Sequence, residues 1–295
     1  MDSKLKLLLP ALVAGAVTTL ADEKPVIQLW PQGLPEGAVQ LAAEKVAKAK
    51  AVKDPERIAW VDDPTMTLYR AKKANGAGLI ICPGGGYNKL AWVKEGLEVA
   101  EYFSSQGITC LVLQYRVPRR DPDTPHAEPL QDIQRAIRVA RHRAKEWGID
   151  PTRLGVLGFS AGGHLVTMSG LHSGKSTYAK VDAADELSAR PDFVCPIYPA
   201  YYADERKPGP LKPEMMVTKQ TPPVFISVTS DDALRGYNAA QFYLELRKQK
   251  IPVELHIFHK GGHGYGIRPS ANPVATWHHR CADWIRAMGF LKGAQ

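Results

Sequence analysis

Residues 153–164 read Arg-Leu-Gly-Val-Leu-Gly-Phe-Ser-Ala-Gly-Gly-His, and this stretch decides the fold. Its apolar first part predicts a buried strand, and the residues from Ala161 onward predict a helix. Between them, Gly158-Phe-Ser-Ala-Gly162 matches the G-x-S-x-G pattern of a sharp strand-to-helix turn. Such a turn holds its serine in a strained conformation with an exposed hydroxyl, so Ser160 is the candidate nucleophile. A serine that only caps the helix is the alternative.

Short apolar runs alternate with longer helical patterns on both sides of this turn. Continuous apolar runs are typical of strands covered on both faces, and strand–helix alternation favours parallel strands with right-handed crossovers. We therefore predict an α/β fold with a mostly parallel central sheet and helices on both faces. The predicted strands are 65–69, 78–82, 108–115, 153–158, 193–198, 224–229 and 253–258, and the predicted helices are 93–106, 130–147, 161–171, 237–249 and 275–288.

A glycine-rich stretch, Cys82-Pro-Gly-Gly-Gly-Tyr87, follows the predicted strand 78–82. Because functional groups of open α/β sheets gather at the carboxyl ends of strands, we expect this loop to lie at the same end of the sheet as Ser160. Its glycines leave backbone N–H groups unobstructed. The amides of Gly85 and Gly86, together with that of Ala161, are candidates for an oxyanion hole, which binds the negative charge that develops on an attacked carbonyl oxygen. A plain flexible turn is the alternative.

The remaining catalytic residues should follow in the order acid, then histidine. Ser230-Asp-Asp232 comes after the predicted strand 224–229, and Lys260-Gly-Gly-His-Gly264 comes after the predicted strand 253–258. We predict that His263 accepts the proton of Ser160 and that Asp232 orients His263, with Asp231 as the alternative acid. Five other histidines lie in predicted strands or helices, or at their ends, where structural roles are favoured: His164, His256, His259, His278 and His279.

Together these residues resemble a family of secreted α/β-hydrolases related to acetylxylan esterases and other carbohydrate esterases. The resemblance covers most of the chain after residue 21. It also rests on the following segments: Leu29-Trp-Pro31, Tyr115-Arg-Val-Pro118, Pro129 with Asp132 and Arg135-Ala136, Trp147-Gly-Ile-Asp150, Tyr198-Pro-Ala200 and Gly261-Gly-His-Gly-Tyr-Gly266. Two positions depart from the pattern. Pro83 replaces the histidine of an HGGG loop, and Ala233-Leu-Arg235 replaces a more usual Asp-Pro-Val-Val.

The resemblance implies an α/β-hydrolase fold and a serine esterase that removes acetyl groups from xylan or related carbohydrates, without a metal or organic cofactor. Two segments that often form a lid, 173–191 and 201–223, are short. We therefore expect a minimal lid and an open cleft, which suits a sugar polymer better than a lipid. Three alternatives stay open: a short-chain carboxylesterase or lipase-like enzyme, a peptidase-like hydrolase, and a non-catalytic binding module.

Aromatic residues near the predicted site are candidates for contact with a sugar ring. Tyr87, Trp92 and Tyr201 are the substrate-binding candidates, and Tyr202 is a fourth aromatic side chain that could contribute. Ordinary packing in the core explains each of them about as well.

The first residues predict a signal peptide. Lys4 and Lys6 precede an apolar run at residues 7–20, which is shorter than the ~20 residues of a spanning helix, and the small residue Ala21 follows the run. We expect residues 1–21 to be removed and residues 22–295 to form a single catalytic domain that is secreted or periplasmic, with no stable membrane insertion. A membrane anchor or a buried N-terminal helix is the alternative.

The composition is ordinary for a globular protein, because 44% hydrophobic and 23% charged residues argue against disorder. The net charge of +8 is spread along the chain. Its densest basic cluster, the lysines of residues 45–53, is interleaved with alanine and lacks stacking aromatics nearby, so we interpret it as a solvated face or surface loop. The expected partner is an ester substrate, either a small molecule or a polysaccharide, and not a nucleic acid.

Four cysteines show neither CxxC nor zinc-ligand spacing. Three of them lie inside predicted strands, where a free thiol packs as a small apolar group. We therefore expect mostly buried free thiols at Cys82, Cys110, Cys195 and Cys281.

Overall fold

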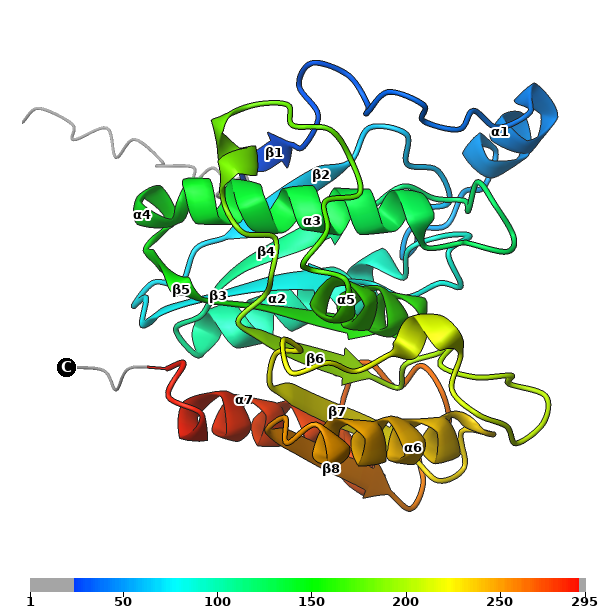
Figure 1. Cartoon of the computed structure of the whole chain (residues 1–295), viewed down its shortest axis with the longest axis vertical. Helices are drawn as coiled ribbons and strands as arrows, with labels where there is room; N and C mark the ends of the chain where they lie inside the picture. Colours follow the sequence, from blue (N-terminus) through cyan, green and yellow to red (C-terminus); the bar gives the residue numbers. More distant parts are fainter. Residues whose placement is uncertain (1–23, 292–295) are drawn as a thin grey trace, which may run out of the picture.

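The structure, a computed structural model, describes residues 24–291, which form an eight-stranded sheet between two layers of helices (Figure 1). The strand order is β1-β2-β4-β3-β5-β6-β7-β8. β1 pairs antiparallel with β2, and β2 pairs antiparallel with β4, whereas every later pair is parallel. The prediction of a mostly parallel sheet with helices on both faces is therefore confirmed.

The strands are β1 (Val26–Gln28), β2 (Thr65–Tyr69), β3 (Gly76–Cys82), β4 (Thr109–Gln114), β5 (Ile149–Phe159), β6 (Phe193–Ile197), β7 (Val224–Thr229) and β8 (Val253–Phe258). The α-helices are α1 (Ala43–Lys50), α2 (Glu98–Ser105), α3 (Ala127–His142), α4 (Ala144–Trp147), α5 (Ala161–Leu171), α6 (Arg235–Lys248) and α7 (Trp277–Ala287). A π-helix, η1 (Val93–Leu97), precedes α2, and there are three 3₁₀ turns, η2 (Ala183–Glu186), η3 (Pro213–Met215) and η4 (Pro273–Thr276).

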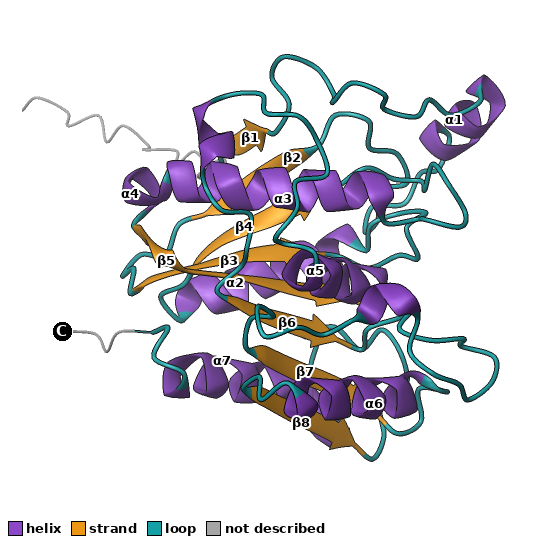
Figure 2. Cartoon of the chain, in the orientation of Figure 1, coloured by secondary structure: helices purple, strands orange, loops and turns teal. Residues whose placement is uncertain are grey.

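Each face of the sheet has its own apolar core, because successive side chains of a strand point to opposite faces. In β3, Ile80 and Cys82 belong to the core covered by α3, α5 and α6, whereas Leu79 and Ile81 belong to the core covered by α2 and α7. Figure 2 shows these helices in front of and behind the strands. Burial on both faces explains why the central strands are continuously apolar.

Several elements differ from the sequence-based expectation, and the predicted helix 130–147 is divided into α3 and α4. β1 has only three residues, too few for a recognisable pattern, and it lies at the edge of the sheet. α1 occupies the lysine-rich stretch that we interpreted as a solvated face or surface loop; it is a helix without buried residues, and alanine and lysine both favour helix. The predicted helix 93–106 is divided into η1 and α2.

The four cysteines are buried free thiols, as predicted. Burial raises the pKa of the Cys82 and Cys110 thiols well above their ordinary value. Among the described residues, no helix is both long enough and apolar enough to cross a membrane. The predicted signal peptide, residues 1–21, lies outside the described residues.

Candidate active site

Ser160 lies in a tight turn between β5 and α5 and has a left-handed backbone conformation, with φ of 52°. Its backbone N–H donates to the Ile197 carbonyl at 3.0 Å, which fixes the turn to the end of β6. A Cβ on Gly158 would overlap the Gly162 carbonyl, and a Cβ on Gly162 would overlap the Cys82 carbonyl. The two glycines of the G-x-S-x-G pattern are therefore required by close backbone packing.

Ser160, His263 and Asp232 form a chain of two hydrogen bonds. His263 Nε2 lies 2.8 Å from Ser160 Oγ, and His263 Nδ1 lies 2.6 Å from Asp232 Oδ2. The serine follows β5, the aspartate follows β7 and the histidine follows β8, so the carboxyl ends of three strands bring them together. Asp232 is buried and His263 is one-third exposed. With a proton on Nδ1, the imidazole can accept the Ser160 proton at Nε2.

Asp231, the alternative acid, binds a different partner. Its carboxylate accepts the backbone N–H of Gly262 at 2.8 Å and that of Gly261 at 3.1 Å. These hydrogen bonds from Gly262 and Gly261 lower the pKa of Asp231. Asp231 therefore holds the backbone of the loop that carries His263, and Asp232 is the carboxylate that contacts the ring.

The glycine loop lies against Ser160, since a Cβ on Gly84 would be 3.0 Å from Ser160 Cβ. Gly85 and Gly86 have φ of 132° and 65°, which favour glycine. Within residues 24–291, the backbone N–H groups of Gly85, Gly86 and Ala161 make no hydrogen bond. These three amides are thus without a hydrogen-bond partner in the described part of the chain.

The structure contradicts an exposed role for Tyr87. Its ring is fully buried, and its hydroxyl is 2.9 Å from His164 Nδ1, so it presents no face to a sugar. The backbone of Tyr87 is left-handed, with φ of 57°. Tyr202 is likewise buried, with its hydroxyl 2.5 Å from Thr167 Oγ1.

The other two aromatic candidates keep partial exposure. Trp92 precedes η1 and packs against both cores. Tyr201 stacks on the buried ring of Tyr87 at 5.9 Å, and its hydroxyl would be 3.5 Å from a Cβ on Gly86. Tyr201 is therefore the aromatic candidate that lies next to the glycine loop.

Left-handed backbone conformations are concentrated at this site. Six described residues other than glycine have positive φ, and all except Lys250 lie in its loops: Tyr87, Ser160, Tyr198, Tyr201 and Ala233. Such strained residues persist only where the surrounding structure holds them, and they cluster at functional sites.

Arg235 and Glu95 contact the site but were not singled out from the sequence. Arg235 donates through Nη1 to Asp232 at 2.9 Å and through Nη2 to Glu205 at 2.9 Å. The only available signal for Arg235 was its place in the unusual Ala-Leu-Arg segment. Glu95 accepts a hydrogen bond from the Gly84 backbone, and nothing in its helical context distinguishes it from a surface glutamate.

The other histidines make contacts away from Ser160 Oγ. His164 is buried beneath the turn, and burial, followed by the charge of His126, holds its pKa well below the ordinary value. His256 Nε2 lies 2.6 Å from Glu254, and the His278 ring packs edge-on against Tyr102 at 4.4 Å.

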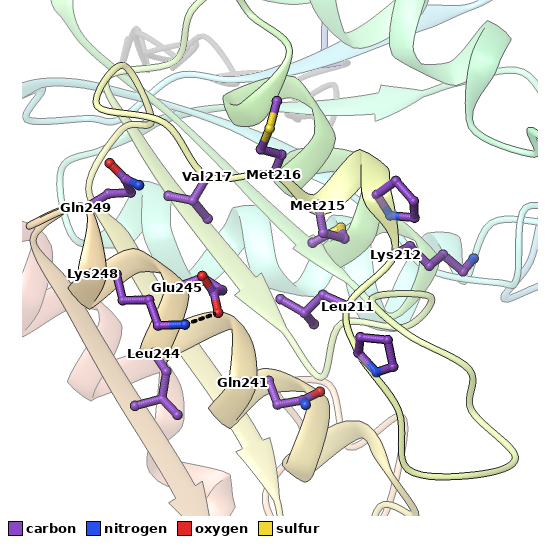
Figure 3. Close-up of a pocket in the computed structure, with 12 residues that line it drawn as sticks. Leu211, Lys212, Met215, Met216, Val217, Gln241, Leu244, Glu245, Lys248 and Gln249 are labelled. Atoms are coloured by element: carbon purple, nitrogen blue, oxygen red, sulfur yellow. Dashed lines mark hydrogen bonds and ion pairs between the residues drawn. The ribbon is translucent and has the colours of Figure 1, made fainter.

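A separate pocket of about 610 Å³ lies between the segment 201–223 and α6 (Figure 3). Its lining includes the apolar side chains of Leu211, Met215, Met216 and Leu244, and none of the three triad residues. In the described part of the chain, no group of three or more His, Cys, Asp and Glu side chains is arranged to hold a metal ion.

Comparison with known proteins identifies the family. A family model described as BD-FAE matches residues 66–198. The chain is 30% identical over 225 residues to an acetylxylan esterase of Xylanibacter ruminicola. The aligned region covers 68% of this chain and 44% of that protein. It is 32% identical over 207 residues to endo-1,4-beta-xylanase B of Butyrivibrio fibrisolvens, covering 64% of this chain and 32% of that protein. The chain thus spans less than half the length of these two relatives.

One solved structure matches over its full length. The crystal structure of an acetyl ester-xyloside bifunctional hydrolase from Caldicellulosiruptor lactoaceticus superposes with a TM-score of 0.72 at 31% identity, covering 93% of this chain and 100% of that chain. Together with the sheet topology and the BD-FAE match, this similarity shows that the chain belongs to the α/β-hydrolase esterases related to acetylxylan esterase.

Proposed function

We propose that this protein is a serine esterase that removes acetyl groups from xylan or related carbohydrates through an acyl-enzyme on Ser160. The observation that carries the proposal is the hydrogen-bonded chain from Ser160 through His263 to the buried Asp232. The acetylxylan esterase and acetyl ester-xyloside hydrolase names of the relatives support the acetyl substrate.

In the first half of the reaction, Ser160 Oγ attacks the ester carbonyl carbon while its proton passes to His263 Nε2. Asp232 stabilises the imidazolium that results. The negative charge on the former carbonyl oxygen is accepted by the amides of the oxyanion hole, Gly85 or Gly86 together with Ala161. The tetrahedral intermediate then collapses, and the sugar hydroxyl leaves with the proton from His263.

In the second half, water replaces the sugar alcohol as the attacking group. His263 takes a proton from the water as its oxygen attacks the acyl carbon. The second tetrahedral intermediate releases acetate, and Ser160 Oγ recovers a proton from His263. The cycle consumes one water and yields one alcohol and one carboxylic acid.

Ester hydrolysis is favoured over glycoside hydrolysis, although relatives carry the words xylanase and xyloside in their names. Glycosidases place two carboxyl groups on either side of the scissile bond. The two buried carboxyls near Ser160 already have two partners each: Asp232 binds His263 and Arg235, and Glu95 binds Gly84 and Tyr198.

We further propose that the protein acts outside the cytoplasm. Basic residues followed by an apolar run at residues 7–20 support a cleaved signal peptide. N-terminal sequencing of the protein exported by a bacterial host should give a chain that begins at Asp22. An exported chain that begins at Met1 would contradict cleavage at Ala21.

A substrate panel tests the proposed activity. We expect the protein to release acetate from acetylated xylo-oligosaccharides, and Ser160→Ala to lower kcat by several orders of magnitude. Each buried CH₂ contributes about 0.8 kcal/mol, so a lipase-like pocket would raise kcat/KM from p-nitrophenyl acetate to octanoate. We expect a flat or falling trend. A steady rise would favour the lipase-like alternative, and full activity in Ser160→Ala would refute the mechanism.

A further inference from the structure

Glu95 is a buried carboxyl group beneath the candidate active site, and the catalytic steps proposed above do not use it. It lies on the π-helix η1, and its side chain is only 6% exposed. Burial of a carboxylate is costly unless hydrogen bonds compensate it. Single π-helical turns are also frequent at functional sites. Both features indicate that the buried position of Glu95 serves the hydrogen bonds that its carboxyl group makes.

The two oxygens of Glu95 hold two different segments of the site. Oε2 accepts the backbone N–H of Gly84 at 2.7 Å, and Oε1 accepts the hydroxyl of Tyr198 at 2.9 Å. A Cβ on Gly84 would lie 2.7 Å from Glu95 Oε2 and 3.0 Å from Ser160 Cβ. The carboxyl group therefore supports the glycine loop at the residue that packs against the nucleophile.

Tyr198 connects Glu95 to the histidine loop. Its hydroxyl accepts the backbone N–H of Gly266 at 3.2 Å, and its ring packs edge-on against the His263 ring at 4.9 Å. Tyr198 has a left-handed backbone, with φ of 38°, so its position depends on these contacts. One carboxyl group thus links the glycine loop, the segment after β6 and the loop that carries His263.

We propose that Glu95 is a positioning residue of the esterase proposed above, on which this inference rests. It fixes the glycine loop that supplies the oxyanion donors and, through Tyr198, the ring of His263. Its negative charge adds to that of Asp232 and favours the imidazolium that forms during the reaction.

The electrostatic surroundings of Glu95 agree with this role. Burial raises its pKa, whereas the hydrogen bonds from Tyr198 and Gly84 and the nearby His263 lower it. Glu95 is therefore close enough to His263 for the two charges to interact. The titratable groups that act on Glu95 or feel its charge are Lys94, Tyr115, Tyr198, His263 and Tyr265.

Glu95→Gln tests the charge while it keeps the shape of the side chain. We expect kcat for p-nitrophenyl acetate to fall about tenfold with KM changed less than about twofold, because the lost stabilisation belongs to the transition state. The acidic limb of the kcat profile should move to lower pH by roughly half a unit, since loss of a nearby anion disfavours the imidazolium. The matched control, Glu101→Gln, removes the same charge from an exposed position on α2 and should change neither quantity.

Tyr198→Phe tests the connection to the histidine loop, because it removes the hydroxyl and keeps the ring on His263. The losses in kcat for Glu95→Gln and Tyr198→Phe should be clearly less than multiplicative in the double variant. Glu95→Ala, which removes both acceptors, should lose about a hundredfold in kcat, comparable to loss of an oxyanion donor. If that variant does not fold, Glu95→Gln and the double variant still decide.

The outcomes separate this inference from the proposed function. Wild-type esterase activity that is lost in Ser160→Ala, together with a Glu95→Gln variant of unchanged kcat and unchanged acidic limb, would overturn the role of Glu95 alone. A wild-type protein without Ser160-dependent esterase activity would instead refute the function on which the inference rests.

Discussion

Arg235 illustrates how one residue departs from a family pattern and gains a contact. It occupies the Ala-Leu-Arg segment after Asp232, and its guanidinium bridges Asp232 and Glu205. Glu205 in turn accepts the backbone N–H of Tyr201 at 3.0 Å. Asp232 is therefore tied to the segment 201–223, which contains the partly exposed Tyr201.

We expect Arg235→Met to lower the free energy of unfolding by about 1–3 kcal/mol, because the buried Asp232 oxygen loses a charged donor. Urea unfolding at neutral pH measures this change. The matched control is Arg206→Met, since the Arg206 side chain is 90% exposed and pairs only with Asp204 at the surface. Its effect should stay within about 0.5 kcal/mol. Equal effects in both variants would mean that Arg235 has no structural role at the triad.

Individual site residues could be predicted from the sequence where a motif fixes the conformation of the backbone. Ser160 and His263 could be predicted because each is flanked by glycines, which the turns at these positions require. Asp231 and Asp232 follow the same strand, and the side chain that reaches the histidine depends on the local path of the chain. The burial of Tyr87 was not predictable, because the residue type does not distinguish a buried tyrosine from an exposed one.

Among elements, the β5–α5 turn is closely packed against the backbone of the glycine loop. A Cβ on Gly162 would overlap the Cys82 carbonyl and lie 2.6 Å from the Pro83 carbonyl, both of which are backbone atoms. We expect Gly162→Ala to cost about 1–3 kcal/mol of unfolding free energy and to lower esterase activity, because the glycine loop must shift. Gly174, whose Cβ would meet nothing within 4 Å, is the control. Gly174→Ala should leave both properties near wild type, and a similar loss there would contradict the packing argument.

The packing of α7 against α2 creates an acid-sensitive position at His278. Burial, followed by the charge of the neighbouring His279, lowers the pKa of His278 to about 4. An unfolded histidine has a pKa of about 6.5, so the unfolded state takes up the proton first as the pH falls. The contribution to stability is therefore complete above about pH 6.5 and decreases as the pH falls toward 4.

We expect His278→Phe to reduce the loss of Tm between pH 7 and pH 4.5, measured by thermal unfolding. His259→Phe, at an exposed position after β8, should retain the full wild-type loss. A His278→Phe variant with the wild-type pH dependence would show that this histidine does not control acid stability.

The bounds of several helices and strands could be predicted from the pattern of apolar residues. The strands β2, β7 and β8 have the predicted bounds. β2 and β7 are buried along their whole length, whereas β8 lies at the edge of the sheet and is only partly buried. The π-helix η1 was not predictable. Its irregularity places Glu95 inward, and no periodicity of the sequence marks that change of backbone.

For the whole molecule, a buried ion pair joins distant parts of the chain. Asp132 on α3 accepts the Trp30 indole N–H at 2.9 Å and pairs with Arg116 at 2.9 Å. Arg135, one turn further along α3, donates to the Leu29 carbonyl at 3.0 Å. The segments Leu29-Trp-Pro31 and Tyr115-Arg-Val-Pro118 were visible as parts of a family pattern, and these contacts give them a structural reason.

We expect Asp132→Asn to lower the unfolding free energy by about 3–5 kcal/mol, because the buried Arg116 loses its counter-charge. Chemical denaturation measures this change in unfolding free energy. The control variant, Asp123→Asn, lies at an exposed position and should change stability by less than about 0.5 kcal/mol. A loss in Asp132→Asn no larger than in that control would contradict the importance of the buried pair.

The order of strands was only partly predictable. The alternation of strands and helices indicated the parallel part, whose carboxyl ends carry the triad loops. The antiparallel β1 and β2 at one edge leave no comparable signal, since direction depends on the path of the connecting loops.

We propose that Ser160 becomes covalently acylated with the help of His263 and Asp232. The most direct test of this proposal is reaction with a fluorophosphonate ester, followed by peptide mass spectrometry of the labelled protein. We expect one phosphonate, on the peptide that contains Ser160. Ser160→Ala should take up no label, and labelling of His263→Ala should be slower by several orders of magnitude. Labelling of a different residue, or an active esterase that loses no activity and takes up no label, would contradict it.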